Sequence, residues 1–320
     1  MSSFIRSAVV VLIVAAFLIA LENALTTALF HLPRLPTDFS GAYLRRELNT
    51  IEVAPAQTIF IGDSVLWGYG IEGDATAVAL LKARGCRCVN LAFKSGNPPN
   101  DYFMARLLLA ADIRPAVVVI DVNQAVLNES DAYYQSLHPT IAEMSAPLLS
   151  ASDRARLSVP DAPPKTQQQV DRILSRISSL YAMRADIREA LRGNDDKSLN
   201  LRMTPGLFEG TYDLSPLTEN NVGVHYLEQT VALLHRDGIR VVAFLTPTNH
   251  ALLRKYIDNA HYTRNSDFLK RTLRQHGAIV MDFDRALPGV EFIDNAHLTS
   301  DGQRRLAALL AAALRKVAPS

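Results

Sequence analysis

The chain has 320 residues, of which 48% are hydrophobic and 20% charged, and its 33 Lys and Arg nearly balance its 32 Asp and Glu. This length is enough for one large domain or two small ones. A net charge of +1 gives no overall attraction to a phosphate backbone, so we expect no nucleic-acid partner. The two cysteines, Cys86 and Cys88, are too few for a disulfide framework or a zinc site, and the eight histidines show no close-set metal-ligand pattern.

An uncharged apolar run occupies residues 8–21 (AVVVLIVAAFLIAL) near the N-terminus. Apolar residues resume after Glu22 and Asn23, which extends the run beyond the core of a signal peptide. We therefore expect residues 1–32 to form a transmembrane helix that is kept as an anchor, with a cleaved signal peptide as the alternative. The signal-like layout favours a periplasmic or other extracytoplasmic body, and the proline-containing residues 33–55 are predicted to be a linker.

From about residue 56 onward, short β-branched runs alternate with helical patterns. The predicted strands span residues 58–61, 88–92, 116–121, 239–245 and 278–282. The predicted helices span residues 75–84, 101–111, 222–235, 266–276 and 301–317. Five strands separated by helices indicate an α/β fold with a doubly wound parallel sheet. The last helix opens with Ser300 and Gln303, three residues apart, which is the spacing of a capping box.

The alternation is interrupted between about residues 124 and 220. This stretch is polar, contains seven prolines and has mostly helical patterns, with too little apolar content for an independent core. We therefore predict one domain over residues 56–318 that carries a helical insertion at 124–220. Because the insertion begins directly after Asn123, a candidate site residue, we expect it to form a lid over that site.

Polar clusters follow three of the predicted strands, where ligands of parallel sheets bind. Ser64 follows the first strand, Gly96 the second and Asn123 the third, while Asp294 and His297 precede the last helix. Serine, histidine and aspartate are the groups of an activated nucleophile, and backbone N–H groups and an asparagine amide are oxyanion donors. Each cluster taken alone is equally compatible with a turn or a helix cap.

Taken in order, these residues resemble the SGNH (GDSL-type) hydrolase superfamily. The sequence Gly62-Asp63-Ser64 matches that family's first block, and Gly96 matches the oxyanion glycine of the second, for which Ser95 and Asn97 leave the register open. The third block of the family usually reads GxND, and here only its asparagine, Asn123, is kept. The resemblance covers residues 56–123 and 220–317, and it implies a three-layer, flavodoxin-like, five-stranded sheet.

The resemblance also implies a role for each residue. Ser64 would attack an acyl carbonyl, His297 would accept its proton, and Asp294 would fix the tautomer of the imidazole. The backbone N–H groups of Ser64 and Gly96 and the side chain of Asn123 would hold the oxyanion. No metal or organic cofactor is required by this chemistry.

A membrane anchor followed by such a domain is similar to cell-envelope proteins that work beside membrane-bound O-acyltransferases. That similarity implies a serine-dependent acyl-ester hydrolase, or an O-acyl (acetyl) transferase, acting on a cell-envelope or extracellular glycan. Trp67, Tyr69 and His250 are candidates for contacts with the substrate, although the two aromatic residues suit internal packing equally well. The alternative is a catalytically silent, membrane-anchored scaffold that binds a glycan or a membrane acyltransferase partner.

Overall fold

The computed structural model describes residues 3–30, 57–71, 73–94, 96–129, 132–159, 211–212 and 215–317, with a few isolated positions between them. Nearly all of the predicted linker at 33–55, and most of the insertion beyond residue 159, lie outside the described residues.

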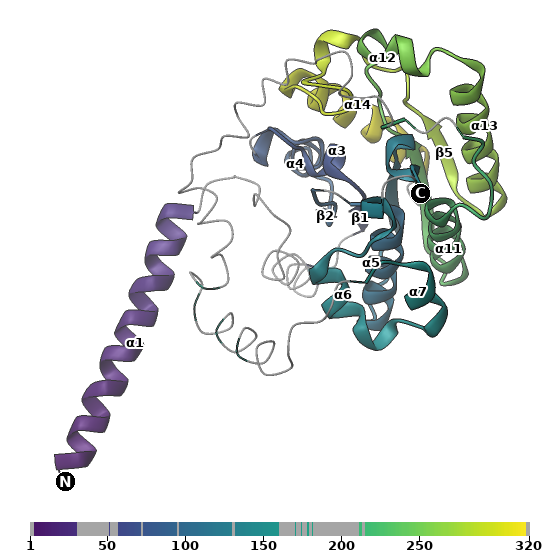
Figure 1. The fold of residues 1–320 in the computed structure, drawn as a ribbon. Coiled ribbons are helices and arrows are strands. Elements are labelled where there is room, and N and C mark those ends of the chain that lie inside the picture. Colours follow the sequence, from purple (N-terminus) through teal and green to yellow (C-terminus); the bar gives the residue numbers. More distant parts are fainter. Residues whose placement is uncertain are drawn as a thin grey trace.

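A five-stranded parallel sheet forms the centre of the molecule, as the sequence predicts (Figure 1). Its strands are β1 (Thr58–Ile61), β2 (Cys88–Asn90), β3 (Val117–Val122), β4 (Arg240–Leu245) and β5 (Ile279–Asp282). Their order is β2-β1-β3-β4-β5 and every neighbouring pair is parallel. All six residues of β3 are buried, which explains why this central strand is almost wholly apolar.

Helices cover both faces of the sheet. The chain moves from β1 outward to β2, then turns back to β3, β4 and β5. Because crossover connections between parallel strands are right-handed, this reversal places α4 (Ala77–Ala83) on one face and α5 (Pro98–Ala110), α11 (Val222–Arg236) and α13 (Ala260–Gln275) on the other. The last helix, α14 (Ser300–Val317), packs against α4. The result is the three-layer arrangement that was expected.

The start of α14 differs from the predicted capping box. The hydroxyl of Thr299 accepts the N–H of Gly302 at 3.2 Å, so the cap lies one residue earlier than Ser300. The fully buried Gln303 side chain has a different role: its Oε1 accepts the N–H of Ala77 at 2.8 Å, and its Nε2 donates to the carbonyl of Val65 at 3.3 Å. Gln303 therefore ties α14 to the segment that follows β1.

The described part of the insertion packs on the main body. It contains η2 (Gln124–Leu127), η3 (Ala132–Gln135), α6 (Pro139–Ser145), η4 (Ala146–Leu148) and α7 (Ala151–Arg156). Helix α6 lies against α5, and the side chains of Leu137 and Ile141 are buried in the same core as the sheet. The carbonyl of Ser136 accepts Asn97 Nδ2–H at 3.0 Å and Asn100 Nδ2–H at 3.2 Å, so this segment borders the loop after β2.

The N-terminal helix α1 (Ser3–Phe30) is a single unbroken helix in Figure 1. Its apolar side chains are exposed on the described stretch between Val9 and Leu21, with Leu12 reaching 69%. The transmembrane helix predicted for residues 1–32 is not found: within the described part of the chain, no helix combines the length and the apolar character that crossing a membrane requires.

Candidate active site

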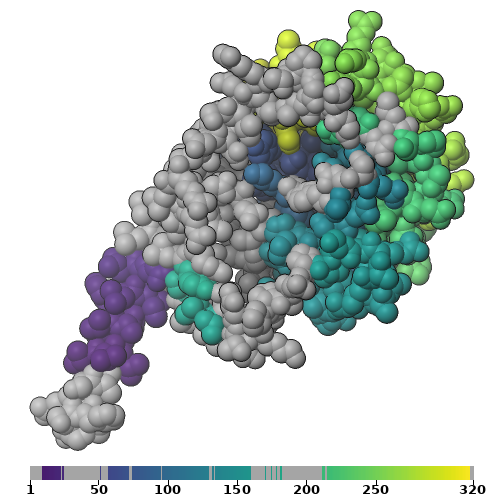
Figure 2. Space-filling view, in the orientation of Figure 1, coloured from purple at the N-terminus to yellow at the C-terminus, as the bar shows by residue number. Residues whose placement is uncertain are grey.

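Four loops at the carboxyl edge of the sheet bring the predicted residues together. Ser64 follows β1, Gly96 follows β2 and Asn123 follows β3, while Asp294 and His297 lie between β5 and α14. The strand order reverses between β1 and β3, because β2 lies on one side of β1 and β3 on the other. In open parallel sheets, ligands bind where the strand order reverses. In Figure 2, blue residues from early in the chain and yellow residues from its end meet in a hollow of the visible face.

Ser64 is the first residue of a short helix, α3 (Ser64–Trp67). The Asp63 side chain caps this helix by accepting the N–H of Val65 at 2.7 Å, and Gly68, with φ 90°, ends it in the left-handed conformation. The N–H of Ser64 donates to none of the residues that the structure describes. The tight turn thus presents both the hydroxyl and a backbone N–H of the same residue.

His297 joins Ser64 to Asp294. Its Nε2 lies 2.8 Å from Ser64 Oγ, and its Nδ1 lies 2.6 Å from Asp294 Oδ2. Burial opposes ionisation of the Asp294 carboxyl, but hydrogen bonds from the His297 ring and from the N–H groups of Ala296 and His297 outweigh it, so the pKa of Asp294 is lowered. An ionised Asp294 can only accept, which places the proton on Nδ1 and leaves Nε2 to accept from Ser64.

The loop after β4 holds the Asp294 turn in place. Asn249 Nδ2 donates to the carbonyl of Asp294 at 2.9 Å, and the N–H of Asn249 donates to the carbonyl of Asn295 at 2.9 Å. Within the turn itself, the N–H of Ile293 donates to the carbonyl of His297 at 2.7 Å. Asn249 could not be predicted from the sequence, because its role depends on a loop 45 residues further along the chain.

Two of the three predicted oxyanion donors have a hydrogen without an acceptor among the residues that the structure describes. One is the N–H of Ser64. The other is the Asn123 amide, which donates one Nδ2 hydrogen to Asp63 Oδ2 at 3.1 Å, while its second Nδ2 hydrogen has no acceptor among the described residues. The N–H of Gly96 instead donates to the carbonyl of Phe93 at 3.0 Å. A Cβ at Gly96 would lie 2.1 Å from the carbonyl oxygen of Gly62, so glycine is required there by the close approach of two backbone segments.

The three residues proposed for substrate contacts have different outcomes. The ring of Tyr69 is half-buried and lies 4.6 Å from the ring of His297, and Lys94 Nζ lies 5.3 Å from the centre of the Tyr69 ring. Trp67 is part of the hydrophobic core and only 4% exposed, which favours internal packing, the alternative left open by the sequence, over a contact with a sugar. His250 Nε2 is hydrogen-bonded to Asp284 Oδ2 at 2.8 Å.

Comparison with known proteins assigns the chain to no family. No protein-family model matches the chain, and no curated protein matches it. Among solved structures, it is similar to an acetyl-xylooligosaccharide esterase from Geobacillus Stearmophilus, with 11% sequence identity and a TM-score of 0.36, over 83% of this chain and 95% of that chain. A similarity of this size does not establish a shared activity. Within the described residues, no group of His, Cys, Asp and Glu has the arrangement of a metal site.

Proposed function

We propose that the protein is an SGNH-type serine hydrolase that cleaves acyl esters, or transfers their acyl group, through an acyl-enzyme on Ser64. The observation that carries this proposal is the continuous chain of contacts from Ser64 Oγ to His297 Nε2 at 2.8 Å and from His297 Nδ1 to Asp294 at 2.6 Å. A serine hydroxyl in reach of a neutral imidazole nitrogen, with the other nitrogen held by a carboxylate, is the arrangement of an activated nucleophile.

In the proposed reaction, Ser64 Oγ forms a bond to the acyl carbon while its proton moves to His297 Nε2. The carbonyl becomes an oxyanion that the N–H of Ser64 and the free amide hydrogen of Asn123 stabilise. The imidazolium, stabilised by Asp294, then returns its proton to the leaving alcohol as the ester bond breaks. Water, or the hydroxyl of an acceptor, attacks the acyl-enzyme through the same steps in reverse order, which releases an acid or a new ester.

We further propose acylated glycans as the substrate class. The half-buried ring of Tyr69 beside His297 is a surface on which the flat face of a sugar packs favourably.

An activated acetyl ester, offered with and without an oligosaccharide, separates hydrolysis from acyl transfer. Acetylated sugar as the main product supports transfer, whereas free acetate in both cases supports hydrolysis.

For the N-terminal helix we propose attachment to a membrane, with the catalytic domain on the extracytoplasmic side and a membrane-bound O-acyltransferase as a partner. The support is the run of exposed apolar side chains on α1 between Val9 and Leu21, which favours burial against lipid. The test is fractionation of cells that express the whole chain: we expect the protein in the membrane pellet after alkaline washing. Recovery in the soluble fraction would contradict attachment.

A fluorophosphonate probe tests the proposed nucleophile directly. We expect the native protein to be labelled and Ser64→Ala to be unlabelled, because the probe bonds covalently to an activated serine. Ser152→Ala, on the exposed face of α7, is the matched control and should be labelled like the native protein. A folded native protein that resists labelling would instead support the catalytically silent scaffold.

A further inference from the structure

Beneath the turn that carries Ser64, two aspartate side chains are in direct contact. Asp121, the second-to-last residue of β3, accepts the N–H of Asp63 at 3.0 Å through Oδ1 and at 3.3 Å through Oδ2, which places the two carboxyl groups side by side. Two adjacent ionised carboxylates repel each other, whereas a proton on one of them removes a charge and provides a hydrogen that the other can accept. The two residues are 4% and 5% exposed, which makes two adjacent charges costly.

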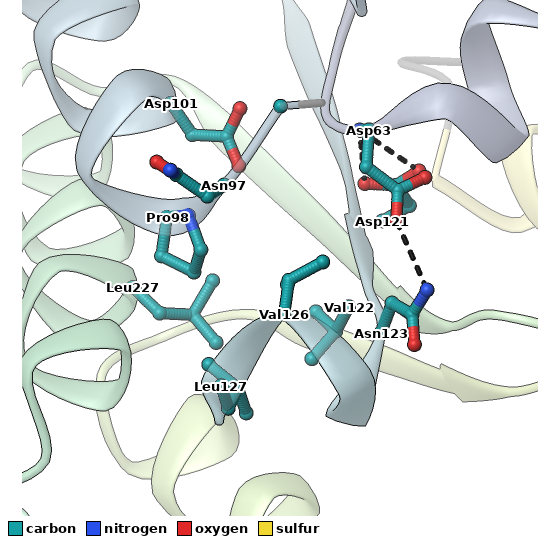
Figure 3. Close-up of a pocket in the computed structure, with 11 residues that line it drawn as sticks. Asp63, Asn97, Pro98, Asp101, Asp121, Val122, Asn123, Val126, Leu127 and Leu227 are labelled. Carbon is teal, nitrogen blue, oxygen red and sulfur yellow. Dashed lines mark hydrogen bonds between the residues drawn. The ribbon is translucent and has the colours of Figure 1, made fainter. Parts of the chain in front are cut away.

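The hydrogen bonds indicate which carboxyl group carries the proton. Asp63 Oδ1 accepts the N–H of Val65 at 2.7 Å, and Asp63 Oδ2 accepts Asn123 Nδ2–H at 3.1 Å. Both oxygens of Asp63 therefore act as acceptors, which favours its ionised form. Asp121 receives a single N–H group, which its two oxygens share at 3.0 Å and 3.3 Å, so it has fewer donors than Asp63 and is the better place for a proton (Figure 3).

Among the described residues, no positively charged side chain faces Asp121 to stabilise its ionised form. The titratable groups that face it are Asp63 and, from α5, Asp101, which is 3% exposed. Its partner on β4 is Phe244, and α11 and η2 contribute apolar side chains to the cavity beside it. That cavity, with a volume of about 10 Å³, has room for about one water molecule. Burial, followed by the charges of Asp63 and Asp101, raises the pKa of Asp121 well above its ordinary value.

We propose that Asp121 keeps its proton in the folded protein and acts as a positioning residue, donating to Asp63 so that Asp63 holds both the first turn of α3 and the amide of Asn123. This role rests on the proposed function, because it matters for the reaction only if Asn123 is an oxyanion donor. It also accounts for Gly62, since a Cβ at that position would lie 1.9 Å from Asp121 Oδ1.

Loss of this proton would place a second negative charge against Asp63. The repulsion would move Asp63 away and release Asn123, so the alkaline limb of activity would report the titration of Asp121. Asp121→Asn separates charge from shape, because an amide donates to Asp63 and accepts its N–H as a protonated carboxyl group does, but does not titrate. Asp121→Leu removes both hydrogen bonds.

The first measurement is independent of activity. A group whose folded-state pKa is raised contributes stability that is fully present below its unfolded pKa of about 3.9 and is lost as pH rises toward its folded pKa. We therefore expect the unfolding equilibrium constant of the wild type, divided by that of Asp121→Asn, to rise up to roughly tenfold per pH unit above pH ~4. A ratio that does not change with pH would overturn the proposal. Repeating the comparison in an Asp101→Asn background removes the contribution of the other buried acid.

The second measurement is the rate of fluorophosphonate labelling against pH. We expect Asp121→Asn to label like the wild type at neutral pH and to keep its rate at alkaline pH, where the wild type declines. Asp121→Leu, if folded, should label at least tenfold more slowly at every pH. Equal alkaline decline in the wild type and Asp121→Asn would contradict the positioning role. If neither protein labels at any pH, the proposed function fails, while the unfolding ratio still decides whether Asp121 holds a proton.

Discussion

Two histidine–aspartate pairs lie near the carboxyl edge of the same sheet. In one, His297 meets Asp294 at 2.6 Å, and in the other, His250 meets Asp284 at 2.8 Å. Their exposure is similar, since the two imidazoles are 21% and 17% exposed and both carboxylates are largely buried. Distance and burial therefore do not distinguish the pairs.

The difference between the pairs lies in the third group. Asp294 binds Nδ1 of His297, which leaves Nε2 free to contact Ser64 Oγ. Asp284 binds Nε2 of His250, and the hydroxyl beside this pair, from Tyr262, donates to the carboxylate at 2.6 Å rather than to the ring. A histidine–aspartate pair thus becomes a candidate catalytic group only where the outer nitrogen faces a nucleophile. Together with Tyr262, the second pair connects α12 (His250–Ile257), α13 and the loop after β5.

The largest expected effect comes from the same substitution made in each pair. Asp294→Asn should lower kcat for an acetyl ester by roughly 10³–10⁴, because the amide no longer fixes the tautomer or stabilises the imidazolium. Asp284→Asn, the matched variant, should change kcat by less than about tenfold, since that carboxylate contacts no residue of the proposed triad in the structure. Steady-state kinetics on both purified variants gives the answer. Equal losses would mean that the second pair also takes part in the reaction.

We expect an intermediate effect on kcat at Asn123, the proposed oxyanion donor of the site that contains His297 and Asp294. Asn123→Ala removes one proposed oxyanion donor and should lower kcat by about 10²–10³ with little change in KM. The matched control is Asn128→Ala, a change at another buried asparagine, whose Nδ2 donates to the carbonyl of Thr211 instead. A loss in KM alone would assign Asn123 to substrate binding rather than to the oxyanion.

The sheet and the gathering of the site were predictable because both follow from local patterns. Strands β1 and β3 are short β-branched runs, and a strand buried on both faces must be apolar along its whole length. Once the strands are parallel, the residues that follow them share one edge of the sheet. This geometry is why Ser64 and His297, 233 residues apart, could be expected within hydrogen-bonding distance, as they are.

The contacts between side chains and residues far away in the sequence could not be predicted. Gln303 has the spacing of a capping residue, but it reaches Ala77, which lies 226 positions earlier. Trp67 follows the candidate nucleophile closely, and only the direction of α3 shows that it belongs to the core. Asp121 has the sequence position of an ordinary strand end, and its contact with Asp63 depends on the register of β1 against β3. A local pattern carries no information on such pairings.

The smallest expected effect concerns stability in acid and again compares the two pairs. For both Asp284 and Asp294, burial opposes ionisation but hydrogen bonds to the charged form outweigh it, so each pKa is lowered in the folded protein. A lowered folded-state pKa contributes stability that is present above the unfolded pKa of about 3.9 and is lost as pH falls through the folded pKa. Each carboxylate should therefore stabilise the fold at pH 7 and lose this contribution in acid.

We expect Asp284→Asn to lower the free energy of unfolding by about 1–2 kcal/mol at pH 7, because hydrogen bonds from His250 and Tyr262 to a charged acceptor are weakened. The difference from the wild type should shrink as pH falls below ~4, where the wild-type carboxylate also becomes protonated. Tyr262→Phe removes one donor and should show a smaller difference with the same pH trend. Urea unfolding at several pH values measures all three proteins, and a difference that stays constant in acid would mean that packing, rather than the charge of Asp284, holds the second pair together.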